Sequence, residues 1–161
     1  MSADAADFDL EVDVVVLGTG GGGLTAALAA HDFGAGEVLI LEKFGMIGGT
    51  SAMSGGMLWI PLNDQQAENG VEDSFDEVVT YVDGLADDGH LDPETFGAFL
   101  EEGPEMLRWF EEKTPVRLRL FLGFPDYQSW ADGAKENGSR SLDNDVFPFV
   151  ELGSWAKWVN P

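Results

Sequence analysis

The residues of this sequence with the most specific chemistry are glycines near the start of the chain. Three of them follow the spacing G-x-G-x-x-G, namely Gly18, Gly20 and Gly23. This spacing is typical of dinucleotide binding, because glycine lets the chain reverse sharply, lets a pyrophosphate approach the backbone, and lets the following helix lie close to the preceding strand. We expect the N-terminus of that helix to present free N–H groups to the phosphates, and we include Gly21 and Gly22 among the cofactor-binding residues. A flexible glycine loop without a ligand is the alternative.

A strand and a helix must flank these glycines if they are to bind a ligand. The apolar run of residues 14–17 predicts a strand covered on both faces, and the alanine and leucine segment of residues 22–33 predicts a helix. A second strand is predicted over residues 37–41 and leads into Glu42. An acid is expected about there, roughly 20 residues after the first glycine, to accept the ribose hydroxyls. The predicted fold class is therefore α/β, with a Rossmann-like βαβ unit followed by the start of a mostly helical region.

A second glycine-rich stretch, LEKFGMIGGTSAMSGGMLWIP at residues 41–61, resembles the second fingerprint of the succinate dehydrogenase and fumarate reductase flavoprotein superfamily. In that family a glycine pair, a hydroxyl residue and a Ser-Gly-Gly turn wrap the flavin side of FAD. Together with VVVLGTGGGGLTAAL at residues 14–28, the resemblance implies FAD as the cofactor. Besides the first glycines and Glu42, the positions implied to bind FAD are Lys43, Gly48, Gly49, Thr50, Ser51, Ser54, Gly55 and Gly56. The residue types agree, because glycines let the backbone pass against a flat ring and hydroxyls bind phosphate or isoalloxazine atoms. A glycine-rich loop without a ligand is again the alternative.

Beyond residue 61 the pattern is mostly helical. The capping box SFDE at residues 74–77 predicts one helix start, and Asp92-Pro93 predicts the next. We expect Gly103-Pro104 to interrupt that second helix, and the apolar alternation of residues 116–122 to form a strand. The predicted organisation is a flexible acidic leader (1–11), the N-terminal part of a FAD-binding domain (12–72), and a truncated helical and short-strand region on the substrate side (73–161).

The stretch PEMLRWFEEKTPVRLRLFLGFPDY at residues 104–127, followed by GSRSL at residues 138–142, resembles 3-ketosteroid dehydrogenases and their close relatives. In those enzymes a tyrosine in a Phe-Pro-Asp-Tyr segment lines the steroid pocket and supports a second, catalytic tyrosine. The resemblance implies that supporting role for Tyr127 and a place in the pocket wall for Phe124. A phenol suits this role, because it donates a hydrogen bond to a developing enolate while its ring packs on a sterol. The alternatives are a packed surface-loop tyrosine and, for Arg140, either a bidentate anion site or an anchor that holds its loop to an acid.

The composition excludes several classes of function. The 161 residues carry a formal net charge of −22, which repels nucleic acid and anionic lipid. This acidity is either a solvated face or an adaptation to high salt. Cysteine is absent, which excludes disulfides and thiolate ligands, and we predict no metal site. The N-terminus does not read as a signal peptide, and no apolar run approaches the roughly 18 residues that cross a bilayer, so we expect a cytoplasmic protein.

The expected function is that of a FAD-dependent oxidoreductase that dehydrogenates a carbonyl-activated C–C bond of a small apolar molecule such as a steroid. Two alternatives remain open, a fumarate-reductase-like enzyme that reduces an enone or a dicarboxylate, and an inactive truncated fragment. Only one βαβ half of a nucleotide fold is found, so we expect the chain to be a fragment. In the family that it resembles, later residues supply the principal acid and base. None of these motifs specifies the electron acceptor or the oligomeric state.

Overall fold

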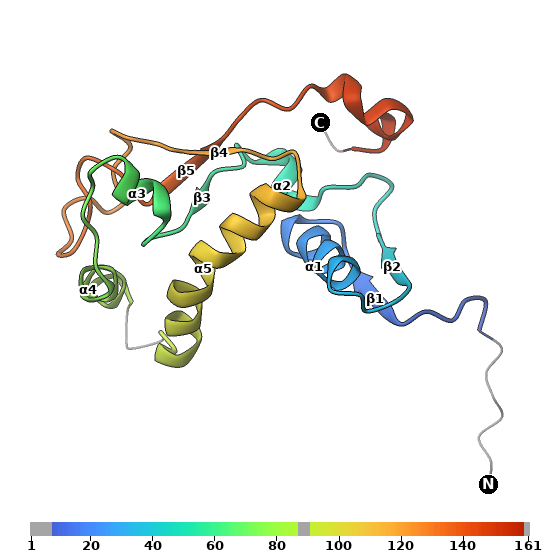
Figure 1. Cartoon of the computed structure of the whole chain (residues 1–161), viewed down its shortest axis with the longest axis horizontal. Helices are drawn as coiled ribbons and strands as arrows, with labels where there is room; N and C mark the ends of the chain where they lie inside the picture. The colour runs from blue at the N-terminus through green and yellow to red at the C-terminus, as the bar shows by residue number, and fades with distance from the viewer. Residues whose placement is uncertain (1–7, 87–90, 160–161) are drawn as a thin grey trace, which may run out of the picture. The chain divides into compact units, whose positions relative to one another are not determined.

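A parallel strand–helix–strand unit carries the first glycine motif. In the computed structural model, which describes residues 8–86 and 91–159, strand β1 (Val14–Leu17) leads into helix α1 (Gly21–Asp32) and then strand β2 (Val38–Leu41). The strands pair in parallel, with Val14 opposite Val38 and Leu17 opposite Leu41. Helix α1 contacts both strands (Figure 1). The predicted Rossmann-like βαβ unit is therefore present. Residues 1–7 of the predicted leader lie outside the described residues.

Glycine ends helix α1. Gly34 has a left-handed backbone with φ of 76°, and its N–H donates to the carbonyl of His31 at 3.1 Å. The next N–H, of Ala35, donates to the carbonyl of Ala30 at 2.9 Å. These two bonds form a Schellman cap, which satisfies the last carbonyls of the helix and turns the chain toward β2.

The chain forms two compact units. One comprises the residues up to Gly55 together with those from Pro148 onward, and the other comprises Gly56–Phe147. The first unit holds the βαβ unit, the short helix α2 (Gly49–Met53) and a kinked 3₁₀ segment, η2 (Phe149–Trp158), whose carbonyl at Trp158 accepts the N–H of Ile47 at 2.6 Å. The predicted boundary after residue 72, between a FAD-binding part and a substrate-side region, stays a prediction.

The second unit is built on a small antiparallel sheet with the strand order β3-β5-β4. Its strands are β3 (Leu58–Trp59), β4 (Leu118–Leu120) and β5 (Ser141–Asn144), and its helices are α3 (Asp64–Glu68), α4 (Phe75–Leu85) and α5 (Pro93–Lys113). A buried cluster of Ile60, Leu107, Leu118 and Leu142 joins α5 to the strands. The sequence had indicated only β4 of these strands, because β3 and β5 are short and lack a clear alternation.

Both predicted helix starts are present. Ser74 caps α4 by accepting the N–H of Glu77, and Asp92 caps α5 with Pro93 at its first position. The predicted interruption at Gly103-Pro104 is wrong, because α5 continues through both residues to Lys113. A proline inside a helix removes one hydrogen bond. Packing offsets this loss, since Gly103 is buried and a Cβ there would lie 3.3 Å from a methyl of Ile60.

Candidate functional site

The first glycine motif forms a tight turn between β1 and α1. Gly18 has φ of 94°, a conformation that side chains other than glycine rarely adopt, and its N–H donates to the carbonyl of Leu41 at 2.7 Å. A Cβ on Gly23 would lie 2.2 Å from the carbonyl oxygen of Gly18, so only glycine lets the first turn of α1 approach this loop. The space around Gly20 and Gly22 is open, with no atom within 4 Å of an added Cβ.

The second glycine motif lies against the first one. Gly49 packs on the backbone of Gly20, where an added Cβ would be 3.2 Å from the Cα atom. The hydroxyl of Ser51, in α2, accepts the N–H of Gly21 at 3.0 Å. Gly48, the residue before α2, has φ of 114° and donates its N–H to Oγ1 of Thr19 at 2.9 Å. Two stretches that are separated in sequence thus meet at the N-terminus of α1.

The predicted ribose acid, Glu42, lies at the same place. Its Oε2 accepts both the N–H of Thr19, at 2.9 Å, and the hydroxyl of Thr19, while Oε1 accepts the N–H of Phe44 at 2.8 Å. The pKa of Glu42 is lowered from its ordinary value, chiefly by the Thr19 hydroxyl and then by the backbone N–H groups of Phe44 and Thr19. The carboxylate is therefore held ionised beside the glycine turn.

The other positions that were predicted to bind FAD lie before, within and after α2. Lys43 and Thr50 are exposed to solvent. The hydroxyl of Ser54 donates to the carbonyl of Ser51 at 2.9 Å, which closes the end of α2. No atom lies within 4 Å of a Cβ added to Gly55. Gly56 begins the second compact unit, where a Cβ on it would lie 2.6 Å from Oδ1 of Asn144 in β5. Their roles toward the cofactor stay predictions.

These residues fit the diphosphate and ribose of FAD. A helix N-terminus binds anions through its free N–H groups and its dipole, and the N-cap of α1, Gly20, brings no capping side chain. No atom lies within 4 Å of a Cβ added to Gly18, Gly20 or Gly22, so on that side the backbone is accessible to a bulky anion. An ionised carboxylate at Glu42 can accept a ribose hydroxyl through the remaining acceptor position of Oε1.

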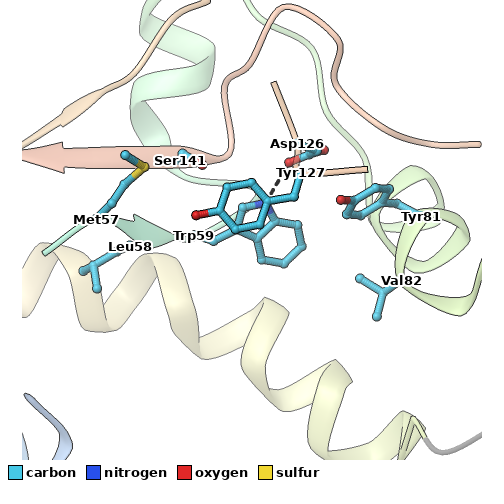
Figure 2. Close-up of a pocket in the computed structure, with 8 residues that line it drawn as sticks. All are labelled: Met57, Leu58, Trp59, Tyr81, Val82, Asp126, Tyr127 and Ser141. Atoms are coloured by element: carbon cyan, nitrogen blue, oxygen red, sulfur yellow. Dashed lines mark hydrogen bonds between the residues drawn. The ribbon is translucent and has the colours of Figure 1, made fainter. Parts of the chain in front are cut away.

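A separate cavity lies within the second unit. Its volume is about 370 Å³, and its walls come from β3, α4, β5 and the loop before residue 128 (Figure 2). The lining residues are Met57, Leu58, Trp59, Tyr81, Val82, Asp126, Tyr127 and Ser141. Aliphatic and aromatic side chains predominate, and this volume lies in the range of small-molecule sites. The cavity suits a compact apolar molecule that carries one or two polar groups.

Tyr127 stands in the wall of this cavity, and its side chain is exposed. Its ring meets the ring of Phe124 edge-on at 6.1 Å, and Phe124 stacks on Phe121 at 5.0 Å. Phe124 thus supports Tyr127 from beside the cavity, and its own predicted contact with substrate stays a prediction. Among these three rings, that of Tyr127 lines the cavity.

A buried ion cluster adjoins the cavity through Asp126, which is one of the lining residues. The guanidinium of Arg140 binds Asp73 through two hydrogen bonds, of 2.9 and 2.8 Å, and donates to Oδ2 of Asp126 at 2.8 Å. The three side chains are at most 2% exposed. The guanidinium also lies over the rings of Trp59 and Tyr81, at 6.0 and 5.6 Å. Of the two alternatives for Arg140, the structure shows the anchor.

The charge states of this cluster are well defined. Burial raises the pKa of Asp73, but hydrogen bonds from Arg140 and Gln66 and the charges of Arg140 and Lys135 outweigh this, so the net pKa is lowered. Burial lowers the pKa of Arg140, but the hydrogen bonds and charges of Asp73 and Asp126 outweigh this effect. The net pKa of Arg140 is therefore raised. Asp73 and Arg140 are therefore held in their charged forms, which stabilises the contact between them.

The backbone on both sides of Tyr127 is fixed to the cavity wall. On one side, Oδ1 of Asp126 accepts the indole N–H of Trp59 at 2.8 Å (Figure 2). On the other side, the N–H of Gln128 donates to the hydroxyl of Tyr81 at 3.2 Å. Oδ2 of Asp126 also accepts the N–H of Lys135 at 2.9 Å. The exposed phenol of Tyr127 is thus carried on a held backbone.

Several of these residues escaped the sequence analysis. Thr19 occupies a variable position of the glycine pattern, and Tyr81 is hidden in the apolar stripe of a helix. Trp59 was read only as part of the glycine-rich loop. Asp126 belongs to the Phe-Pro-Asp-Tyr segment, but its hydrogen-bond partners Trp59 and Arg140 are distant in sequence. No local sequence pattern predicts these contacts.

No helix among residues 8–86 and 91–159 is long and apolar enough to cross a membrane. In the same part of the chain, no group of three or more His, Cys, Asp or Glu side chains is arranged to hold a metal ion.

Comparison with known proteins gives a consistent result. A model of a family described as FAD binding domain matches residues 13–158. The chain is 40% identical, over 87% of its length, to 4-oxocyclohexanecarboxylate 2-dehydrogenase of Sinomonas cyclohexanicum, and 38% identical, over 94% of its length, to 3-oxosteroid 1-dehydrogenase of Mycobacterium tuberculosis. It spans only 24% and 26% of those two relatives.

A solved structure matches as well. The crystal structure of 3-ketosteroid delta1-dehydrogenase from Sterolibacterium denitrificans, in complex with 1,4-androstadiene-3,17-dione, aligns with a TM-score of 0.83 at 36% identity. The alignment covers 92% of this chain and 26% of that one. The similarity therefore extends over nearly all of the described residues and about a quarter of the relative.

Proposed function

Because the chain belongs to the FAD binding domain family, we propose that it acts in a FAD-dependent oxidoreductase that dehydrogenates a C–C bond next to the carbonyl of an apolar cyclic ketone. The observation that carries this proposal is the meeting of the two glycine motifs at the N-terminus of α1, through the contacts of Thr19 with Gly48 and of Gly21 with Ser51. The named relatives, which act on an oxosteroid and an oxocyclohexane acid, support the choice of substrate class.

The residues of this chain have separate tasks in that reaction. The N–H groups at the start of α1 bind the diphosphate, and Glu42 binds the ribose, so that the dinucleotide is held by backbone and one carboxylate. FAD, if bound, would supply the hydride acceptor for this dehydrogenation. Loss of the hydride from one substrate carbon and of a proton from the adjacent carbon to a base leaves a new C=C bond. The phenol of Tyr127 supports this proton removal by hydrogen bonding, and the apolar cavity walls exclude water from the ketone.

The test measures binding of each ligand separately. Added FAD is expected to bind the purified chain with a change in flavin fluorescence, and 1,4-androstadiene-3,17-dione is expected to quench tryptophan fluorescence, since Trp59 lines the cavity. The variant Trp59→Phe assigns that signal to the cavity, because Trp130 and Trp155 are exposed and do not belong to its lining residues.

Each outcome separates the candidate functions. Binding of FAD together with fumarate, and not with the steroid ketone, would favour the fumarate-reductase-like alternative. A chain that binds neither flavin nor ketone would be the inactive fragment. Saturable binding of both FAD and the ketone, with the ketone signal weakened in Tyr127→Ala, is the result that supports the proposal.

A further inference from the structure

Thr19 is a buried polar residue at a position for which the glycine pattern specifies no chemistry. Its exposed fraction is 5%, although both of its neighbours, Gly18 and Gly20, border open space. Buried polar groups are stable only when hydrogen-bonded. The Thr19 hydroxyl acts as both donor and acceptor, since it donates to Oε2 of Glu42 and accepts the N–H of Gly48 at 2.9 Å. One side chain therefore links the ends of β1 and β2 to the start of α2.

These bonds decide the orientation of the Glu42 carboxylate. Oε2 receives two hydrogen bonds from Thr19, one from the hydroxyl and one from the N–H at 2.9 Å, so both of its acceptor positions are used. Oε1 receives one bond, from the N–H of Phe44 at 2.8 Å, and keeps one acceptor position. The carboxylate is consequently fixed in rotation, with a single oxygen available to a ligand.

We propose that Thr19 is a positioning residue for adenine nucleotides, which orients Glu42 so that Oε1 accepts one ribose hydroxyl. This inference rests on the proposed function, because it takes Glu42 as the ribose acid. It also modifies the expectation from the sequence that this carboxylate accepts both ribose hydroxyls. With Oε2 saturated by Thr19, the second hydroxyl must find another partner.

Charge supports the same arrangement. Hydrogen bonds to an ionised acceptor are about twice as strong as neutral ones, and the Thr19 hydroxyl is the largest influence that lowers the pKa of Glu42. Without that hydroxyl, the carboxylate keeps the backbone bonds from Thr19 and Phe44 but loses its side-chain constraint. Its ability to bind one hydroxyl in a fixed direction falls, while its charge remains.

The experiment compares two probes that differ only in the ribose. ADP carries both ribose hydroxyls and the diphosphate, whereas 2′,3′-dideoxy-ADP carries the diphosphate alone. Binding of each probe to the purified chain is measured by calorimetry for the wild type, Thr19→Val, Thr19→Ser and Glu42→Gln. Valine matches the shape of threonine without its hydroxyl, and serine keeps the hydroxyl, so the serine variant is the matched control.

The expected result is a selective loss. Thr19→Val binds ADP about tenfold more weakly, equivalent to about 1.4 kcal/mol, whereas its affinity for dideoxy-ADP stays within about twofold of wild type. Thr19→Ser retains the wild-type preference for ADP. Glu42→Gln reduces the preference for ADP at least as much as Thr19→Val does, because it removes the negative charge of the group that accepts the ribose hydroxyl.

Three results would overturn the inference, and they are distinguishable. If Thr19→Val binds ADP and dideoxy-ADP more weakly by the same factor, Thr19 only stabilises the loop. The same conclusion follows if Thr19→Ser does not retain the wild-type preference for ADP. A wild type that prefers ADP over dideoxy-ADP, with the same preference in Thr19→Val, means that Glu42 is correctly assigned and that Thr19 does not orient it. A wild type that binds neither probe contradicts the nucleotide site itself, and with it the proposed function.

Discussion

The guanidinium of Arg140 donates to the carboxylate of Asp126 at 2.8 Å, and both side chains are buried. Asp126 immediately precedes Tyr127, whose exposed side chain lines the cavity. A buried ion pair therefore fixes the residue next to this tyrosine. The second carboxylate, Asp73, neutralises the remaining edge of the guanidinium. The cluster therefore connects the chain near α4, the loop around residue 126 and the start of β5.

Replacing Arg140 is expected to destabilise the second unit strongly. In Arg140→Ala, two buried carboxylates lose the guanidinium that compensates their charge, and such a change costs about 3 to 5 kcal/mol of unfolding free energy. Urea unfolding measures this loss. Arg108→Ala is the matched control, because its pair with Asp64 is more than half exposed, and such pairs contribute up to about 1 kcal/mol. Similar losses in the two variants would show that the buried cluster is not a major source of stability.

Acidification is expected to weaken the fold through Asp73. Its pKa is lowered in the folded state, so its contribution to stability is complete above the unfolded pKa, about 3.9, and is lost as the pH falls through the folded pKa. Unfolding free energy measured between pH 7 and pH 2 should therefore decline below about pH 4. In Asp73→Asn this decline should be smaller, and an identical pH profile for the variant would contradict the assignment.

Gly23→Ala is expected to disrupt the first glycine motif. The added Cβ would overlap the carbonyl oxygen of Gly18, from which it would be 2.2 Å away, and overpacking of this kind costs about 1 to 3 kcal/mol. Gly22→Ala is the control for stability, because no atom lies within 4 Å of its Cβ and alanine is the better helix former. Thermal unfolding of the two variants compares them directly. Equal melting temperatures would mean that the close approach of α1 to the loop is absent in solution.

Tyr81→Phe is expected to loosen the backbone next to Tyr127. The variant keeps the ring under Arg140 and removes the hydroxyl that accepts the N–H of Gln128. Amide hydrogen exchange at Gln128 should become faster, while exchange in the buried part of α5 stays unchanged. Tyr127→Phe serves as the comparison, since its own hydroxyl is exposed and its loss should leave the Gln128 amide protected. Unchanged exchange in Tyr81→Phe would show that this hydrogen bond does not hold the loop.

Local patterns were enough to predict the βαβ unit and both capped helix starts. The apolar run before Gly18 and the cap at Gly34 are encoded within a few residues, and so are the caps at Ser74 and Asp92. Local reasoning failed at Pro104, where the helix continues because Gly103 packs on Ile60, a residue distant in sequence. It also missed β3 and β5, since strands of two and four residues carry too little periodicity to be recognised.

The sequence by itself determined the class of the protein, because backbone conformations that require glycine and carboxylates at the ends of strands are recorded in residue type and spacing. The tertiary structure alone decided which groups meet. It joined Thr19 to Glu42 and Gly48, and it enclosed Arg140 between Asp73 and Asp126. Hydrogen bonds reach only about 3 Å, so the partners of a buried polar group depend on how distant segments pack, and residue order does not state this.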